Sequence, residues 1–275
     1  MTTRTLPVET ENHWFQLVQT LKGNRQKRSH ERLFFVEGVR SINPLRGNPR
    51  WQAEALLYPA GRRLSGWAND VLAEVVAPYH LAVKKDLMDR LSDREESSEI
   101  IAVVKIPATG LEDLPADATS RFVLLDRPGN PGNLGSIIRS CDAFGVTGIV
   151  IAGHAVDPYD PLVVRASEGA FFTQRIVHAG NQSSLDAWLA RLARDVPGFT
   201  VVGTSAKSDT HIADCPLSGP TLLCFGNETL GLSQWLKSRC ATVAGIPMNG
   251  VASSLNLACA VTTVLYEVHR QSRKS

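Results

Sequence analysis

The chain has 275 residues, of which 43% are hydrophobic and 20% charged, and its net charge is +2. This length and composition suit one or two globular domains and exclude a chain that is disordered throughout. No segment reaches the ~20 apolar residues that a membrane-spanning helix needs. Since Met1 to Pro7 also lack the apolar core of a secretion signal, we expect a cytoplasmic protein without membrane attachment.

The cysteines are too scattered for a disulfide framework or a zinc site. There are five, at positions 141, 215, 224, 240 and 259, and no C-x-x-C pair occurs. An odd number with wide spacing is typical of a protein in a reducing compartment. We therefore expect no bound metal.

The positive charge is concentrated at the start of the chain. Residues 1–50 hold nine basic and four acidic side chains, a net charge of +5, so the remainder carries −3. A basic lobe on a near-neutral body indicates a polyanion as partner, although a solvated basic surface is an equal alternative from charge alone.

The first hundred residues predict a small α/β domain, because strands alternate with helices. Asn12 is a capping residue before apolar side chains at helical spacing. The predicted helices are 12–21, 64–76 and 84–91, and the predicted strands are 33–38, 55–58, 80–83 and 99–105.

Residues 108–119 are rich in Pro, Gly and polar side chains, which predicts a linker between domains 1–107 and 120–275. The second part alternates again, and its apolar strands without polar alternation indicate a parallel sheet covered on both faces. Its predicted strands are 121–126, 147–152, 171–177, 199–203, 221–225 and 241–246, and its predicted helices are 134–144, 184–194, 233–238 and 254–270.

Three loops after these strands stand out, because ligands of such sheets bind beyond the carboxyl ends of the strands. They are Asp126-Arg-Pro-Gly-Asn-Pro-Gly-Asn-Leu-Gly-Ser-Ile-Ile-Arg139, Phe225-Gly-Asn-Glu-Thr-Leu-Gly-Leu-Ser233 and Ile246-Pro-Met-Asn-Gly-Val-Ala-Ser-Ser-Leu-Asn256. The glycines of the first loop fit neither the dinucleotide fingerprint nor the P-loop. Taken singly, each loop has an ordinary alternative. The first could be a tight turn, the second could carry Glu228 as a helix-capping carboxylate, and the third could supply Ser253 and Ser254 as N-caps.

Together, the three loops resemble the signature motifs of the SpoU/TrmH RNA methyltransferases of the SPOUT superfamily. The first motif is matched by Asn133-Leu-Gly135, Arg139 and Ala143-Phe-Gly145, the second by Gly226-Asn-Glu228 and Gly231-Leu232, and the third by Ile246-Pro-Met248, Gly250 and Ser254-Leu-Asn256. This resemblance covers the chain from about residue 120 to the end. The basic start and Phe34-Phe-Val-Glu-Gly38 resemble, more weakly, the ribosomal-protein-like RNA-binding domain that precedes it in many members.

The resemblance implies a C-terminal trefoil-knotted α/β domain and methyl transfer from S-adenosyl-L-methionine to a ribose 2′-hydroxyl of RNA. It implies that Arg139 clamps an RNA phosphate and stabilises the forming alkoxide, since a guanidinium is a poor base at its usual pKa. Supporting roles fall on Asn133, Glu228, Ser254 and Asn256. The implied cofactor-binding residues are Thr204, Gly226, Asn227, Ile246, Met248, Ser254 and Leu255.

RNA binding is expected from the basic N-terminal lobe, through Lys22, Arg25, Lys27, Arg28 and Arg32. The resemblance also implies a homodimer packed through the knotted domains, with the last helix at the interface. The apolar stripe Leu255, Ala258, Val261, Leu265 and Val268 could serve that interface or pack on the chain's own sheet.

Three departures from the family pattern leave the RNA target open: Asn130, Leu162 and Glu168. Ribosomal RNA is favoured over transfer RNA because the front domain is typical of the branch that acts on rRNA. The alternatives are a tRNA ribose methyltransferase, a non-catalytic RNA-binding or ribosome-associated protein with the same fold, and a nucleotide-dependent oxidoreductase, for which the G-x-G-x-x-G fingerprint is missing.

Overall fold

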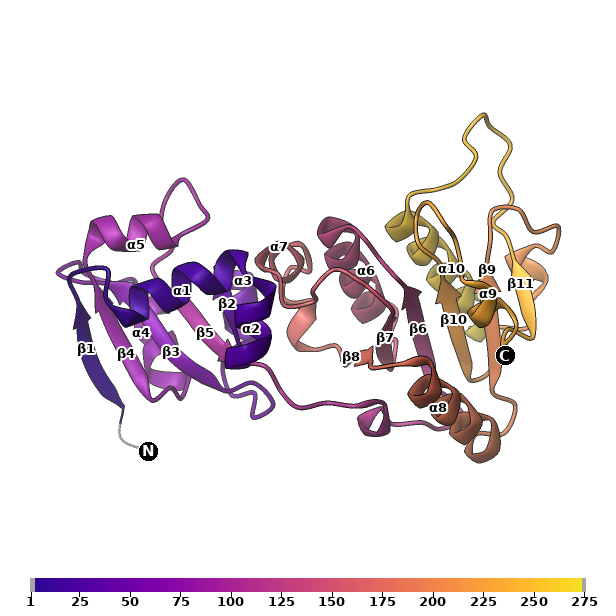
Figure 1. Cartoon of the computed structure of the whole chain (residues 1–275), viewed down its shortest axis with the longest axis horizontal. Helices are drawn as coiled ribbons and strands as arrows, with labels where there is room; N and C mark the ends of the chain where they lie inside the picture. Colours follow the sequence, from indigo (N-terminus) through magenta and orange to yellow (C-terminus); the bar gives the residue numbers. More distant parts are fainter. Residues whose placement is uncertain (1–2, 274–275) are drawn as a thin grey trace. The chain divides into compact units, whose positions relative to one another are not determined.

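The computed structural model describes residues 3–273, which fall into two compact units. The first unit contains the described residues up to Ala108 together with Asp157–Thr173. The second contains Thr109–Val156 and the described residues from Gln174 onward. Each unit is built around a sheet of its own (Figure 1).

The sheet of the first unit has five strands in the order β1-β4-β3-β5-β2. β5 runs antiparallel to both of its neighbours, whereas β1, β4 and β3 are parallel. β1 was not among the strands predicted from the sequence; it contains Pro7, whose missing N–H is tolerated because β1 lies at the edge of the sheet. The strands are β1 (Arg4–Val8), β2 (Leu33–Glu37), β3 (Ala53–Pro59), β4 (Tyr79–Val83) and β5 (Ile101–Lys105).

Alternate residues of β2 serve opposite faces of this sheet. Phe35 joins the core under α1 (His13–Gly23) and α5 (Lys85–Leu91). Phe34 belongs to an aromatic cluster with Trp51, Tyr159, Phe171 and Phe172, so the segment Asp157–Thr173 packs on the first unit. The other helical segments are α2 (Arg25–Glu31), α3 (Val39–Ile42), η1 (Asn43–Leu45), α4 (Gly66–Glu74), α7 (Pro161–Ala166) and η3 (Ala170–Phe172).

The sheet of the second unit has six strands in the order β11-β9-β10-β6-β7-β8, all parallel, as the sequence predicted. Phe122 and Leu124 pack under α8 (Gln182–Asp195) and α9 (Gln234–Lys237), whereas Val123 and Leu125 are equally buried on the opposite side. The strands are β6 (Arg121–Asp126), β7 (Gly148–Ala152), β8 (Ile176–Ala179), β9 (Thr200–Thr204), β10 (Thr221–Phe225) and β11 (Thr242–Ala244).

Two helices of this unit pack together: α6 (Pro131–Ala143) and α10 (Leu257–Ser272). A hydrogen bond of 2.7 Å between the hydroxyls of Ser140 and Thr262 joins them. The remaining helical segments are η2 (Leu111–Asp113), α8 (Gln182–Asp195), η4 (Ile212–Asp214) and α9 (Gln234–Lys237). None of the helices in the described part of the chain has the length and apolar character that crossing a bilayer requires.

Two further segments differ from the sequence expectation. Residues 171–177 are not one strand: η3 and β8 lie on either side of Thr173, because Phe171 and Phe172 pack into the aromatic cluster of the first unit. The linker segment 108–119 is partly packed, since Leu111 and Leu114 are buried in the core of the second unit. The assignment of the parts to RNA binding and to methyl transfer, and the trefoil knot, stay predictions.

Candidate functional site

A cavity of about 430 Å³ opens in the second unit, beyond the carboxyl ends of β9, β10 and β11. The loops that follow β10 and β11 form most of its lining. All seven residues expected to bind cofactor line it: Thr204, Gly226, Asn227, Ile246, Met248, Ser254 and Leu255. The structure thus brings this group together, and it adds Lys207, which no motif pointed to.

Three of the expected catalytic residues form one hydrogen-bonded chain. Asn133 donates its side-chain N–H to Glu228 at 3.1 Å, and Asn256 donates to the side-chain oxygen of Asn133 at 2.9 Å. The oxygen of Asn256 accepts from the backbone N–H of Ala258 at 2.8 Å and so caps α10. The helix therefore begins at Leu257, and not at Ser254 as predicted, and each amide has its donor and acceptor ends fixed by its neighbours.

The first loop continues directly into α6, with Asn130 as N-cap and Pro131 in the first helical position. The helix thus begins three residues earlier than the sequence predicted. The Asn130 side chain accepts from the backbone N–H of Asn133 at 2.9 Å, which holds Asn133 in the first turn. At a rise of about 1.5 Å per residue, Arg139 lies about 9 Å further along the axis.

Arg139 is exposed, is not among the residues that line the cavity, and makes no hydrogen bond or ion pair with the described residues. Ser254, in contrast, lines the cavity and is exposed. The structure therefore joins Asn133, Glu228 and Asn256 directly, and leaves Arg139 as an available cation on the same helix as Asn133.

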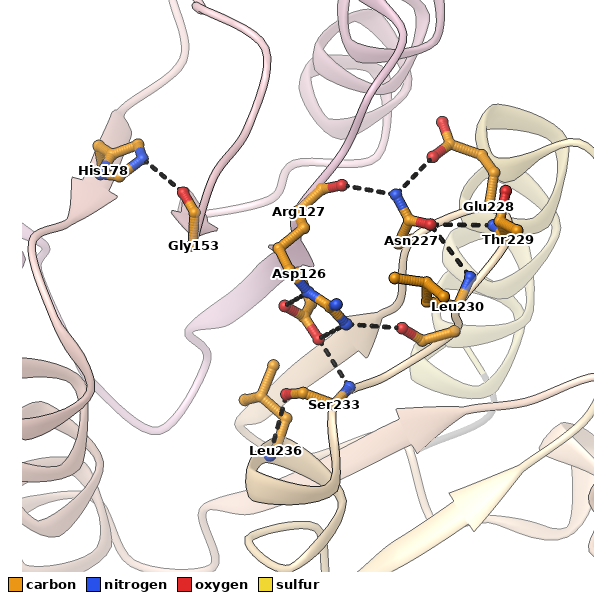
Figure 2. A network of polar contacts seen from close by, with 11 residues as sticks. Asp126, Arg127, Gly153, His178, Asn227, Glu228, Thr229, Leu230, Ser233 and Leu236 are labelled. Atoms are coloured by element: carbon orange, nitrogen blue, oxygen red, sulfur yellow. Dashed lines mark hydrogen bonds and ion pairs between the residues drawn. The ribbon is translucent and has the colours of Figure 1, made fainter.

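An ion pair that the sequence analysis missed holds the first two loops together (Figure 2). The Arg127 guanidinium donates to both carboxylate oxygens of Asp126, at 2.8 and 3.0 Å, and to the carbonyl oxygen of Gly231 at 3.1 Å. Asp126 is 4% exposed and also accepts from the backbone N–H of Ser233 at 2.7 Å. The hydrogen bonds to the Asp126 carboxylate raise the pKa of Arg127 above its usual value. In the sequence, the signal for this ion pair was an aspartate, Asp126, directly after the apolar residues of a predicted strand.

Asn227 organises the turn of the second loop (Figure 2). Its side-chain oxygen accepts from the backbone N–H groups of Thr229 and Leu230, both at 3.0 Å, and its side-chain N–H donates to the carbonyl oxygen of Arg127 at 2.9 Å. Glu228 is thereby presented to the side chain of Asn133, in the first turn of α6, and it contacts this helix start through that side chain.

The cavity combines apolar walls with a few polar groups. Ala244, Ile246 and Leu257 contribute apolar surface, and Thr204 donates its hydroxyl to the carbonyl oxygen of Cys224 at 2.9 Å. Such a lining suits a small organic ligand that has both apolar and polar parts. Because loops form most of this lining, backbone N–H and C=O groups can form hydrogen bonds with a ligand in the cavity.

In the first unit, one of the expected RNA contacts is wrong. Arg28 is 2% exposed, and its guanidinium donates to Asp157 at 2.7 Å and to Asp160 at 3.4 Å. It also donates to the carbonyl oxygen of Leu21 at 2.7 Å. The guanidinium N–H groups that a phosphate would need are already bonded to two carboxylates and a carbonyl. Arg28 therefore forms a structural ion pair and does not bind RNA.

The other four basic residues are closer to the surface. Lys22 is also largely occupied, by an ion pair with Asp93 at 2.7 Å, and its side chain is 18% exposed. Lys27 pairs with Glu31 one turn along α2 and is 39% exposed. Arg25 and Arg32 are exposed.

The apolar stripe of the last helix turns inward. Val261, Leu265 and Val268 are each at most 2% exposed within the unit, so they pack on the chain's own core. Leu255 lies before the helix and is 40% exposed. The outer face of α10 carries Tyr266, which is 58% exposed.

Known proteins match both halves of the chain. The profile of the SpoU rRNA Methylase family matches residues 120–266, and the profile of the SpoU L30e-like domain matches residues 12–102. A 23S rRNA (uridine(2479)-2′-O)-methyltransferase from Streptomyces viridochromogenes is 42% identical over 266 residues, which cover 96% of this chain and 92% of that protein.

Solved structures agree with this match. The crystal structure of the SpoU methyltransferase AviRb from Streptomyces viridochromogenes in complex with AdoMet has a TM-score of 0.89 at 43% identity and covers 96% of this chain and 99% of that chain. An AdoMet-bound rRNA methyltransferase from Sinorhizobium meliloti has a TM-score of 0.85 at 27% identity and covers 97% of this chain and 98% of that chain.

Proposed function

The chain belongs to the SpoU rRNA Methylase family, and on this premise we propose that it transfers a methyl group from S-adenosyl-L-methionine to a ribose 2′-hydroxyl of ribosomal RNA. The observation that carries the proposal is the convergence of the three family motifs at one place in the second unit. The hydrogen-bonded chain of Asn133, Glu228 and Asn256 borders a cavity that all seven expected cofactor residues line.

The cavity residues fit S-adenosylmethionine. A volume of about 430 Å³ suits a ligand of that size, since small-molecule pockets span roughly 300–1,000 Å³. Ile246, Leu255 and Leu257 would hold the adenine, and Thr204 and Ser254 would offer hydroxyls to its polar parts. When bound, the cofactor supplies a methyl group on a positively charged sulfur.

Arg139 would orient the RNA. Methyl transfer needs the ribose oxygen in line with the methyl carbon and the sulfur, and such alignment can lower a barrier by about 7–11 kcal/mol in ideal cases. An exposed guanidinium without internal partners can grip a phosphate through two parallel hydrogen bonds. Its charge would also stabilise the alkoxide that forms as the 2′-hydroxyl loses its proton.

Glu228 would help to hold Arg139 and the ribose in position. Its carboxylate is held by Asn133, which is held in turn by Asn256, so its orientation is fixed before substrate arrives. Preorganised polar groups need no rearrangement during the reaction, which is why they are effective. We assign Asn133 and Asn256 as positioning residues and Ser254 as a cavity contact.

The first unit would bind RNA through Arg25, Lys27 and Arg32. These side chains are less buried than Arg28 and lie on or just after α2. Since such contacts are made to phosphates, RNA affinity should fall steeply with salt. The RNA substrate also places the enzyme in the cytoplasm.

A homodimer is part of the proposal. Because the apolar stripe of α10 is turned inward, the partner would contact its outer face, where Cys259, Thr263 and Tyr266 follow helical spacing and are exposed. Light scattering at micromolar concentration should give twice the mass of the chain, 29.9 kDa. A monomer under these conditions contradicts the dimer.

The decisive experiment is incorporation of a radioactive methyl group from S-adenosylmethionine into unmodified 23S rRNA, 16S rRNA and total tRNA, followed by mapping of alkali-resistant linkages. Ribose methylation of rRNA supports the proposal. Methylation of tRNA alone would move the enzyme to the tRNA branch. No transfer to any RNA, with cofactor binding absent in calorimetry, would leave an RNA-binding protein with this fold.

A further inference from the structure

A second cavity, of about 280 Å³, lies within the first unit and is lined by three arginines. They come from three separate segments: Arg40 from α3, Arg94 from the loop after α5, and Arg165 from α7. Gly38, at the end of β2, and Glu168, just after α7, complete the opening. None of these arginines belongs to the motifs or to the basic cluster 22–32.

Glycines bring the three segments close together. Gly38 has a φ of +96°, and a Cβ there would overlap the Arg94 guanidinium, which therefore lies close to the backbone of Gly38. Gly169 has a φ of +95°, and a Cβ there would collide with the carbonyl oxygen of Arg40. At Gly169 only glycine suits both the backbone conformation and the space, whereas at Gly38 the positive φ is what favours glycine. The close approach of the segments that carry Arg40 and Gly169 is thus built into the backbone.

The cavity has an excess of positive charge. Glu168 pairs with Arg40, which is 75% exposed. Arg94 and Arg165 are also exposed, and neither guanidinium makes a hydrogen bond or ion pair with the described residues. Arg94 and Arg165 line the same cavity, and their like charges repel one another unless an anion binds to both.

Other acidic groups nearby do not supply that anion. Glu37 and Asp93 line a smaller adjoining cavity together with Arg94 and Arg165. Asp93 forms its ion pair with Lys22 at 2.7 Å. Glu37 is 9% exposed and accepts hydrogen bonds from the Ser92 hydroxyl and from the backbone N–H of Asp93.

We infer that Arg94 and Arg165, with Arg40 beside them, form a binding site for a backbone phosphate of the substrate RNA. This inference rests on the proposed function, which supplies RNA as the partner. Guanidinium groups match phosphate oxygens in pairs and remain charged at every physiological pH. A phosphate is small enough for this cavity, and Arg94 and Arg165 can bind it without breaking an internal contact.

Glu168 weakens anion binding at this site, because its carboxylate pairs with Arg40 and competes with phosphate for that guanidinium. A carboxylate at the edge of the site also repels the RNA backbone. Removing its charge should therefore strengthen RNA binding, while removing the arginines should weaken it.

The test uses the full-length chain and a transcribed 23S rRNA fragment that the wild type methylates, or total deproteinised rRNA if none is found. The double variant Arg94→Gln/Arg165→Gln is compared with Arg62→Gln/Arg63→Gln, which removes the same charge from an exposed turn of the same unit. Fluorescence anisotropy gives the dissociation constant over a range of KCl concentrations, and circular dichroism confirms the fold.

We expect the cavity variant to lose at least 10-fold in affinity at 0.1 M KCl and the control pair less than about 3-fold. Each lost phosphate contact should reduce the slope of log K against log salt by about 0.7–0.9. Glu168→Gln should bind RNA at least 2-fold more tightly than the wild type. At saturating RNA, kcat and the affinity for S-adenosylmethionine should stay at wild-type values.

Equal losses in the cavity and control variants, or an unchanged salt slope in a folded cavity variant, would overturn the inference. So would weaker RNA binding by Glu168→Gln. Failure of the proposed function gives a different result: the wild type then binds rRNA with these salt slopes but transfers no methyl group to it.

Discussion

The side-chain amide of Asn256 donates a 2.9 Å hydrogen bond to the side-chain oxygen of Asn133, a residue 123 positions earlier in the chain. Asn256 must present its N–H group to Asn133, because its oxygen already caps α10. Asn133 must then present its own N–H group to Glu228. The capping of α10 by Asn256 thus fixes, through Asn133, the orientation of the Glu228 carboxylate.

This relationship predicts that Asn133→Asp lowers methyl transfer at least 10-fold, because an Asp carboxylate cannot donate to Glu228 and repels it. The side chain is partly exposed, so we expect the free energy of unfolding to change by less than about 1 kcal/mol. The double variant Asn133→Asp/Glu228→Gln restores a donor and an acceptor in reversed order. Its kcat/KM should fall by less than the product of the two single effects, and strictly additive losses would show that the two side chains act independently.

The family resemblance implied only that Asn133 and Asn256 serve one active site; their hydrogen bond was not predicted. Asn133 and Asn256 are ordinary helix-start residues when each is read alone, and no local pattern shows that they meet. The parallel sheet was predicted from its apolar strands, because burial on both faces leaves a direct mark on composition. The family membership is confirmed by the comparisons, whereas the roles of the individual residues stay predictions.

Other features depend on tertiary packing that local patterns do not encode. α7 and η3 lie between β7 and β8 in sequence but pack with the first unit, because Phe171 and Phe172 complete its aromatic cluster. Arg28 reads as a surface cation in a basic stretch. Its burial depends on Asp157, 129 residues away, which only the folded chain brings near.

Arg139 is expected to act in the reaction and not in cofactor binding. Arg139→Ala should reduce methyl transfer by at least about 10²–10³-fold, the usual effect of removing one positioned charge at a reacting oxygen. Because Arg139 does not line the cavity, the dissociation constant for S-adenosylmethionine should stay within about 3-fold of wild type in calorimetry. Arg175→Ala removes another exposed arginine of the same unit and serves as the control. Wild-type turnover by Arg139→Ala would exclude Arg139 from the mechanism.

Arg28→Ala should destabilise the first unit by about 3–5 kcal/mol, the cost of leaving buried carboxylates without their partner. Asp157 is 9% exposed and would lose its 2.7 Å contact. Lys27→Ala, on the same helix but paired at the surface, should cost at most about 0.5 kcal/mol. Urea unfolding followed by circular dichroism measures both, and equal effects would show that the Arg28 ion pair contributes no more than a surface pair.

His80 should make the stability of the first unit sensitive to mild acid. Partial burial lowers the pKa of His80 below 6.5, and its Nε2 atom is buried without a hydrogen-bond partner in the described structure. Below pH 6.5 the unfolded chain binds a proton at this side chain before the folded chain does, so stability is lost as pH falls through the folded pKa. The denaturation midpoint should drop between pH 7.5 and 5 more in wild type than in His80→Gln. Parallel curves for the two proteins would contradict this.

Gly226 should be intolerant of any side chain. A Cβ at this position would overlap the backbone of Gly231 and Leu232, so the loop after β10 could not keep its turn. Gly226→Ala should therefore weaken S-adenosylmethionine binding at least 10-fold in calorimetry, because that turn forms one wall of the cavity. Gly219→Ala, just before the same strand, has nothing within 4 Å of the added carbon and should bind as wild type does. If Gly226→Ala binds the cofactor normally, the turn after β10 does not form the cofactor site, and the cavity would have to bind something else.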